Sequence, residues 1–373
     1  MLHICNNYIS SKAHAGLVKS LSYYDSQVVF VPVRREEDVG VNDITCSRIS
    51  IVYLRYPDFI KYFPLIKVFI ISVLIIRAMR KFSITIDQFK NENVLAHNLW
   101  SDGVPAYFCS IIMKLKYSLV VRNTDINYFI PKLFHARPLI KLIVRKSRSL
   151  IFVSEAYHRR FHERWPSIIN CARKIMVVPN GVESFWLEQP EAIGLSQQDY
   201  RECGVIYVGK FNENKNIGGL FSAVQSLNQK TPCKLTLIGG SLDQVRALCG
   251  IQGRLPDWLQ VKEWVSSDSE LVKELSKHRV FAMPSFKETF GLVFVEALCC
   301  GCSIVHSKNE GIDGFFEEEF IQSVDPAAVD DIEQALAKLL KGFPIGIGKD
   351  TAIRVTQRFD WNEVAKDYLD AFK

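Results

Sequence analysis

The sequence predicts an α/β protein with two domains, each built on a parallel sheet. The chain has 373 residues, more than one typical hydrophobic core accommodates. Short apolar runs alternate with longer amphipathic segments, the pattern of β-α-β units. Residues 184–202 form a polar stretch with few regular signals, and we expect this stretch to be a linker.

Apolar runs in both halves are expected to be strands, because they are short and bounded by turn residues. In the first half these runs are His3–Cys5, Gln27–Val33, Ile49–Leu54, Val94–Ala96, Ser118–Val121, Ser149–Val153 and Ile175–Val178. In the second half they are Gly204–Val208, Lys234–Ile238, Val261–Trp264, Val280–Met283 and Ser303–Val305. The chain is therefore divided into domains at residues 1–183 and 203–356, with a closing helical segment at 357–373.

Charge is distributed unevenly along the chain. Up to Val178 there are 26 Lys/Arg and 12 Asp/Glu, a balance of +14, and the remainder carries −8 within a total of +6. A basic first half and an acidic second half predict different partners for the two. Nucleic acid is not expected, since no recognised motif and no interleaving of aromatic and basic residues is present.

Ten cysteines are scattered along the chain, and the group Cys299, Cys300 and Cys302 is their one cluster. A metal site would need a second pair of ligands at a suitable spacing, and the sequence shows none. We expect buried, reduced thiols, no metal site and no signal peptide at the N-terminus, which places the protein in the cytoplasm.

Two segments suggest contact with a membrane surface. The apolar core of residues 62–82 is too short to cross a bilayer as a helix, which needs about 20 apolar residues. Basic residues without an acid flank it, and residues 132–150 repeat that character. A buried helix is the alternative for residues 62–82. We expect peripheral binding to an anionic membrane at its inner face.

The segment PSFKETFGLVFVEALCCGCSIV carries two carboxylates eight positions apart, Glu288 and Glu296. The first is expected in a loop before a helix and the second about one turn inside that helix. A helix N-terminus offers backbone N–H groups to an anionic ligand, and carboxylates accept hydrogen bonds from hydroxyls. This combination suits a nucleotide sugar.

A second candidate site follows the expected strand at Gly204–Val208. Gly209, Lys210 and Lys215 would lie at its carboxyl end, where parallel α/β sheets bind ligands. Two cations there could hold a diphosphate and neutralise its charge as it leaves. Solvated loop lysines are the alternative.

Taken together, PNGVE, VGKFNENKNIGGL, LTLIGG and PSFKETFGLVFVEALCCGCSIV resemble the successive motifs of retaining family-4 (group 1) glycosyltransferases over residues 177–305. RFDWNEVAKDYLDAF is similar to that family's closing helix. The resemblance implies the GT-B fold: two facing Rossmann-like domains with a cleft between them. The second domain would bind the nucleotide sugar, the first would bind the acceptor, and the closing helix would cross back to the first. It also implies that no cofactor and no obligatory metal is needed.

Residue roles also follow from the resemblance. Lys215 matches a lysine on the donor diphosphate, and Lys210 stands where most members have arginine. Glu296 matches the glutamate that binds the ribose, and Glu288 the one near the transferred sugar. The remaining donor contacts implied are Gly209, the backbone of Phe290, Gly291 and Leu292, and Gly16, which the sequence places before a helix.

Three first-domain residues are acceptor-side candidates: His97, Arg122 and Asp125. Many members of the family carry a histidine after the strand that corresponds to residues 119–125 here, and that segment has no histidine. His97 follows a different strand. For His97 the alternatives are a capped strand end and a histidine hydrogen-bonded to backbone, and for Arg122 and Asp125 the alternative is surface ion pairing.

The resemblance therefore predicts a hexosyltransferase-like enzyme that uses a UDP- or GDP-sugar with retention of configuration. Its acceptor is expected to be a lipid-linked saccharide of bacterial envelope polysaccharide (O-antigen, capsule or exopolysaccharide). The alternatives are a transferase with a soluble acceptor and a catalytically silent GT-B module that binds a nucleotide or a partner.

Overall fold

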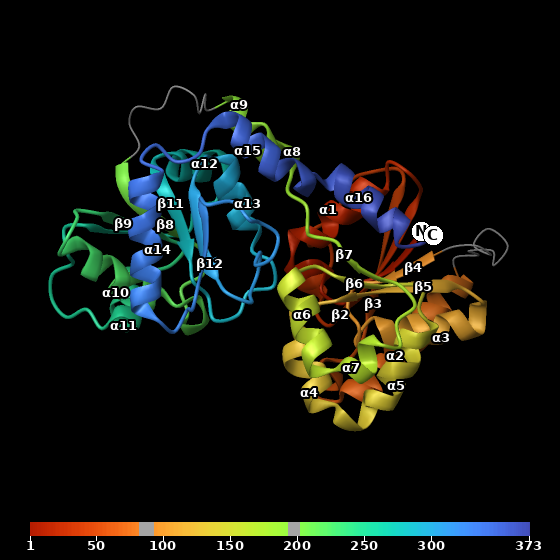
Figure 1. Cartoon of the computed structure of the whole chain (residues 1–373). Helices are drawn as coiled ribbons and strands as arrows, with labels where there is room; N and C mark the ends of the chain where they lie inside the picture. Colours follow the sequence, from red (N-terminus) through yellow and green to blue (C-terminus); the bar gives the residue numbers. More distant parts are fainter. Residues whose placement is uncertain (82–92, 193–201) are drawn as a thin grey trace. The chain divides into compact units, whose positions relative to one another are not determined.

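The computed structural model describes residues 1–81, 93–192 and 202–373, which fall into two compact units. The first unit comprises residues 1–153, 157–181 and 361–373, and the second comprises residues 154–156 and 182–360. Figure 1 shows that each unit is a sheet flanked by helices. The fold class predicted from the sequence, α/β with two Rossmann-like units, is confirmed.

The first unit contains a seven-stranded sheet whose described pairings are all parallel, in the order β3-β2-β1-β4-β5-β6-β7. Its strands are β1 (Leu2–Ile4), β2 (Gln27–Val33), β3 (Ile49–Arg55), β4 (Asn93–Ala96), β5 (Lys116–Val121), β6 (Leu150–Phe152) and β7 (Ile175–Val177). Its main helices are α1 (Lys12–Leu21), α2 (Pro64–Lys81), α3 (Gly103–Met113), α5 (Arg137–Lys146), α6 (Glu155–Arg164) and α16 (Trp361–Asp370). Shorter turns are η3 (Asp58–Tyr62), η4 (Asp125–Phe129), α4 (Ile130–Lys132), η5 (Phe134–Ala136) and α7 (Pro166–Ile169).

The second unit contains a six-stranded parallel sheet in the order β10-β9-β8-β11-β12-β13. Its strands are β8 (Glu202–Val208), β9 (Lys234–Ile238), β10 (Leu259–Lys262), β11 (His278–Met283), β12 (Ser303–Ser307) and β13 (Ile321–Val324). Its helices are α8 (Ser184–Leu187), α9 (Gln189–Ala192), α10 (Ile217–Asn228), α11 (Leu242–Cys249), α12 (Asp268–Ser276), α13 (Leu292–Cys299), α14 (Val329–Gly342) and α15 (Lys349–Thr356).

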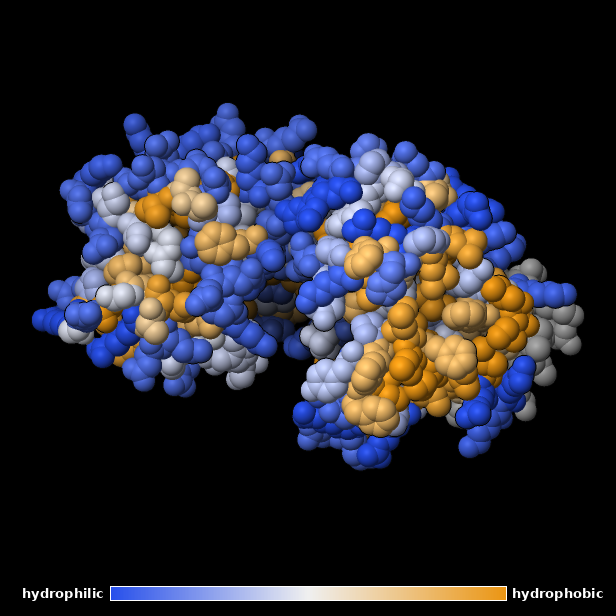
Figure 2. Space-filling view, turned by 90° about the horizontal axis from the view of Figure 1, so that it is seen from below, coloured by the Kyte–Doolittle hydropathy of each residue, from blue (hydrophilic) through white to orange (hydrophobic). Residues whose placement is uncertain are grey.

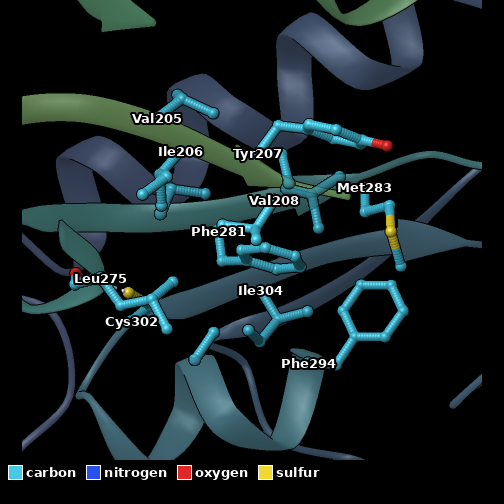
Figure 3. Packing of buried hydrophobic residues seen from close by; sticks show 14 of the residues in the cluster. Val205, Ile206, Tyr207, Val208, Leu275, Phe281, Met283, Phe294, Cys302 and Ile304 are labelled. Carbon is cyan, nitrogen blue, oxygen red and sulfur yellow. Dashed lines mark hydrogen bonds between the residues drawn. The ribbon is translucent and has the colours of Figure 1, made fainter. Parts of the chain in front are cut away.

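The core of the second unit forms around the central strands β8, β11 and β12, which are buried on both faces and apolar in their middle residues. Figure 3 shows side chains of β8, β11 and β12 packed against α13. Phe281 of β11 meets Phe294 of α13 edge to face, with ring centroids 5.4 Å apart. This packing fixes where β11 ends and α13 begins, and so positions the loop between them.

The closing helix α16 packs on α1 of the first unit. The indole of Trp361 lies against two glycines, since a Cβ atom at Gly16 or at Gly181 would come within 2.5 Å of that ring. Ser20 Oγ also donates a hydrogen bond of 2.7 Å to the Trp361 carbonyl. Only glycine permits so close an approach.

Three sequence-based expectations need correction. Gly16 does not precede a helix: α1 begins at Lys12, and Ser11 caps it by accepting a hydrogen bond from the Ala13 N–H. The strand expected at Val261–Trp264 starts two residues earlier, at Leu259. Strand β13 was not expected, because Ile-Gln-Ser-Val is too short and polar to stand out.

The stretch expected to be a linker, residues 184–202, begins with the two short helices α8 and α9 of the second unit. Residues 193–201 of it lie outside the described residues. Among the described helices, none is both long enough and apolar enough to cross a membrane.

Candidate functional site

The switch point of the second sheet lies between β8 and β11. From β8 the chain adds β9 and β10 on one side, and from β11 it adds β12 and β13 on the other. In sheets of this type, ligands bind at the carboxyl ends of the strands that flank such a point. Lys215 follows β8 and Glu288 follows β11, so the fold brings both residues to the expected edge.

Lys215 and Glu288 form an ion pair at this edge. Lys215 Nζ lies 2.5 Å from Glu288 Oε2, and the two side chains are only 20% and 15% exposed. The second carboxylate oxygen, Oε1, accepts a hydrogen bond of 2.9 Å from the Thr289 N–H. A lysine and a carboxylate 73 positions apart thus form one small polar group, and their roles toward a donor stay predictions.

The loop that carries Glu288 is held from two directions. The Glu288 N–H donates to Glu310 Oε2 at 2.9 Å, and the Glu288 carbonyl accepts from the Gly311 N–H at 2.9 Å. Asn214 Nδ2 donates to the Lys287 carbonyl at 2.9 Å, which ties this loop to the loop after β8. These contacts hold the Glu288 side of the ion pair in place.

The loop enters α13 through Gly291. Its φ is +78°, a left-handed conformation that favours glycine, and a Cβ there would lie 2.7 Å from the Phe294 ring. Leu292 is the first helical residue, so the free N–H groups of this helix end begin at the loop. Phe290 is buried against Phe315 and Phe359 and anchors the loop from beneath.

Glu296 lies in the second turn of α13, where the sequence analysis placed it, and it is half-buried. Lys210 directly follows Gly209 at the end of β8, and its side chain is exposed. The loop after β9 comes close to this strand end: a Cβ at Gly239 would lie 2.3 Å from the Gly209 carbonyl oxygen. At these two glycines no side chain covers the backbone on the edge where a diphosphate is expected.

The three acceptor-side candidates lie together at the carboxyl ends of β4 and β5. Arg122 Nε donates to the His97 carbonyl at 3.1 Å, and the Asp125 carboxylate accepts from the backbone N–H groups of Arg122, Leu99 and Trp100, each at 3.0 Å. Burial raises the pKa of Asp125 to about 6 despite these donors. Surface ion pairing is therefore the wrong explanation for Asp125, whose contacts tie two loops together.

His97 is fully buried between two further histidines, which the sequence analysis did not single out. Its Nε2 lies 3.1 Å from His3 Nδ1, and its Nδ1 lies 3.1 Å from His14 Nδ1. Burial lowers the pKa of all three rings, that of His3 to about 4. Gly16, two residues beyond His14, is explained by its contact with Trp361, and its role toward a diphosphate stays a prediction.

Comparison with known proteins identifies the second unit. The model of the family "Glycosyl transferases group 1" matches residues 197–344. The sequence of the second unit is thus similar to that of the group 1 glycosyltransferases. The chain is 27% identical over 173 residues to the O-antigen chain mannosyltransferase B of Escherichia coli, and 22% identical over 224 residues to a probable sucrose-phosphate synthase of Thermosipho melanesiensis. These alignments cover 45% and 57% of the chain, and about half of each relative (45% and 50%).

Solved structures similar to this chain match it over its whole length. Sucrose-phosphate synthase from Thermosynechococcus elongatus superposes with a TM-score of 0.73 at 17% identity, covering 100% of this chain and 97% of that one. Anabaena Alr3699/HepE in complex with UDP gives 0.67 at 14% identity, covering 99% and 98%. At these identities the likeness establishes the fold, which is that of the GT-B class.

Proposed function

We propose that the protein transfers a sugar, with retention of configuration, from a UDP- or GDP-sugar to a hydroxyl of a lipid-linked saccharide in bacterial envelope polysaccharide assembly. The pairing of Lys215 with Glu288 at the switch point of the second sheet carries the donor half of this proposal. Support for a nucleotide-sugar donor comes from the family match and from the similarity to a UDP-bound structure.

In the proposed reaction, Lys215 leaves Glu288 for the donor diphosphate and Glu288 becomes free to accept hydrogen bonds from sugar hydroxyls. Lys210 adds a second positive charge, as a point charge and without the planar fork of arginine. As the bond between the sugar and the phosphate breaks, negative charge grows on the departing nucleoside diphosphate, and these cations stabilise it. No enzymic nucleophile is assigned, and the acceptor proton is expected to pass to the donor phosphate.

Replacing Glu296 with alanine is expected to weaken nucleotide binding about 10- to 100-fold, because a carboxylate that accepts ribose hydroxyls contributes about 1.5–3 kcal/mol. Calorimetric titration of UDP and GDP into the wild type and the variant measures this effect. Glu270→Ala, on α12 of the same unit, is the control. An unchanged Kd in the Glu296 variant would remove this residue from the donor site.

The lipid-linked acceptor is argued from the surface of the first unit. Large apolar side chains are exposed on η3 and α2, at the end of α3, and on η4 and η5. Figure 2 shows an extended apolar area on the face of this unit where α2 to α5 are drawn in Figure 1. Its exposed members are Phe59, Tyr62, Phe63, Leu65, Ile66, Phe69, Ile111, Ile112, Tyr128 and Phe134. A contiguous apolar area of this kind marks contact with a membrane or a partner.

Positive charge accompanies this apolar area, which favours an anionic membrane over an apolar protein partner. Lys132 lies beside one of its tyrosines, with Lys132 Nζ 4.2 Å from the Tyr128 ring, and Lys61 beside Tyr62 is paired with Asp58 at 2.7 Å. Ile111 also lines a cavity of about 610 Å³, whose other lining residues include Lys116, Lys146, Arg148 and Arg173 and no acid. Among the described residues none of these four cations has an ion-pair partner. Such a cavity suits a phosphate-bearing headgroup.

The double variant Phe63→Ser/Phe69→Ser is expected to reduce flotation with phosphatidylglycerol vesicles at least about tenfold, because two aromatic side chains would no longer enter the bilayer interface. Both residues are more than half exposed, so the fold should tolerate the change. Trp264→Ser removes an equally exposed aromatic residue from the acidic second unit and should have no effect. Flotation that is unaffected by the double variant, or by replacing phosphatidylglycerol with phosphatidylcholine, would contradict this assignment.

A soluble acceptor is the competing possibility, and the similarity to sucrose-phosphate and trehalose-phosphate synthase structures favours it. The two differ in one measurable respect. A lipid-linked acceptor predicts transfer that depends on added vesicles or micelles, whereas a soluble sugar or sugar phosphate would be glycosylated without them. A silent module would release no nucleoside diphosphate from any nucleotide sugar.

A further inference from the structure

The first sheet has its own switch point, between β1 and β4, and a chain of buried polar side chains lies there. β2 and β3 extend the sheet from β1, and β5 to β7 extend it from β4. Helix α1, which carries His14, follows β1, and His97 directly follows β4. His3, His14, His97 and Gln27 are each at most 2% exposed and are linked by hydrogen bonds.

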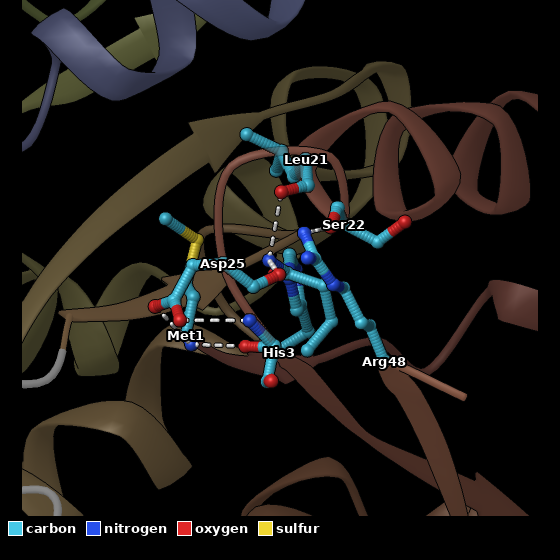
Figure 4. A network of polar contacts seen from close by, with 8 residues as sticks. Met1, His3, Leu21, Ser22, Asp25 and Arg48 are labelled. Atoms are coloured by element: carbon cyan, nitrogen blue, oxygen red, sulfur yellow. Dashed lines mark hydrogen bonds and ion pairs between the residues drawn. The ribbon is translucent and has the colours of Figure 1, made fainter. Parts of the chain in front are cut away.

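Gln27 fixes which atom donates in each hydrogen bond of this row of side chains. Its Nε2 donates to the carbonyls of Leu21 and Asp25, at 3.0 and 2.6 Å, so the amide nitrogen faces these two acceptors. Its Oε1 therefore faces His3 Nε2, 2.7 Å away, and can only accept. Figure 4 shows the surroundings of these hydrogen bonds, with His3, Leu21 and Asp25 labelled. His3 must carry its proton on Nε2.

The remaining protons follow in sequence, because a neutral imidazole has one donor nitrogen and one acceptor nitrogen. With the proton on Nε2, His3 Nδ1 accepts from His97 Nε2. His97 Nδ1 is then an acceptor and must receive the proton of His14 Nδ1. This leaves His14 Nε2 as an acceptor, and among the described residues it has no hydrogen-bond partner.

We propose that His14 Nε2 binds the acceptor saccharide by accepting a hydrogen bond from one of its hydroxyls, and that Gln27, His3 and His97 are positioning residues that hold His14 in this tautomer. The inference rests on the proposed transfer to a hydroxyl acceptor. It is supported by the place of His14 at the switch point, the edge of the sheet where ligands bind. Burial lowers the pKa of all three rings and so keeps them neutral, as this assignment of donors and acceptors requires.

A transition-metal ion is the competing occupant, since Cys5 and one nitrogen each of His14 and His97 lie within 4.8 Å of one another. Two observations favour the hydrogen-bonded chain. The Nδ1 atoms of His14 and His97 are 3.1 Å apart, a hydrogen-bond length, whereas two nitrogens on one tetrahedral zinc would be about 3.3–3.4 Å apart. Arg122, which donates to the His97 carbonyl, places a positive charge beside the same group.

The tautomers can be observed directly in the 373-residue protein labelled with ¹⁵N-histidine. Long-range ¹H–¹⁵N spectra at neutral pH should show the proton on Nε2 in His3 and His97 and on Nδ1 in His14. Adding octyl α-mannoside as a saccharide probe should move the His14 Nε2 resonance, and the resonances of His3 should stay in place. A proton on His14 Nε2, a histidinium at His14, or zinc retained after dialysis and detected by elemental analysis would overturn the proposal.

Two matched variants separate the two nitrogens of His14. His14→Asn keeps an amide near the Nδ1 position, which can donate to His97, and removes the Nε2 acceptor. His14→Gln keeps an amide near the Nε2 position. We expect His14→Asn to raise the KM for the acceptor about three- to tenfold, and His14→Gln to stay within about twofold, both with an unchanged KM for the nucleotide sugar. Equal losses in the two variants would refute the role of Nε2. If the wild type transfers no sugar, the proposed function fails. The spectra still show whether the three histidines have the proposed tautomers.

Discussion

Replacing Lys215 with alanine is expected to lower the turnover of nucleotide sugar about 10²- to 10³-fold, the usual loss when one preorganised group that stabilises transition-state charge is removed. The expectation follows from the position of its ammonium group, at the switch point and 2.5 Å from Glu288, with 20% of its side chain exposed. The variant loses the charge that meets the departing diphosphate. It also leaves Glu288 without its cation, which should further weaken the binding of an anionic donor.

Release of UDP or GDP under saturating donor measures this effect, and circular dichroism establishes that the variant is folded. Lys338→Ala, which removes an exposed lysine of α14, is the matched control and should keep full activity. Lys215→Arg keeps the charge and should lose less than the alanine variant. Near-normal transfer by a folded Lys215→Ala protein would refute the assignment of this residue.

Replacing Trp361 with alanine is expected to destabilise the packing of α16 on α1 by about 3–5 kcal/mol, the usual cost of truncating a buried tryptophan. The indole is 8% exposed and occupies a slot formed by Gly16 and Gly181. Because glycines form the slot, no neighbouring side chain can move in to fill the cavity. Loss of this contact should free the closing helix from the first unit.

Native-state hydrogen exchange of the α1 amides measures this change as a lower free energy of opening. Asp367→Ala, on the exposed face of α16, is the control, and its effect should stay within about 0.5 kcal/mol. A change of less than about 1 kcal/mol for Trp361→Ala would contradict the role given to the glycine slot.

The sequence predicted most of the fold because parallel strands buried on both faces are continuous apolar runs, and such runs are visible without tertiary information. It failed where that signal is weak. The Ile-Gln-Ser-Val segment of β13 has too few apolar residues to stand out. Gly16 was placed before a helix, although the capping side chain of Ser11 marks a helix that begins at Lys12.

The candidate site of the second unit was predictable in part, because its motifs are short segments of sequence. Glu288 and Glu296 lie on one loop and the helix that follows it, so their spacing carries the information. The contact of Lys215 with Glu288 depends on the pairing of β8 with β11, and no local pattern in the sequence indicated it. The histidine chain joins residues 3, 14, 27 and 97 from three strands or strand ends and a helix, and no local pattern connects them.

We infer above all that the second unit binds and activates a nucleotide sugar. The most direct test incubates the purified chain with UDP-, GDP- and ADP-sugars and measures thermal stabilisation together with release of the nucleoside diphosphate. We predict that a UDP- or GDP-sugar stabilises the protein and is slowly hydrolysed, and that Lys215→Ala abolishes the hydrolysis. A folded wild type that neither binds nor hydrolyses any of these donors, with or without a saccharide acceptor, would contradict the claim.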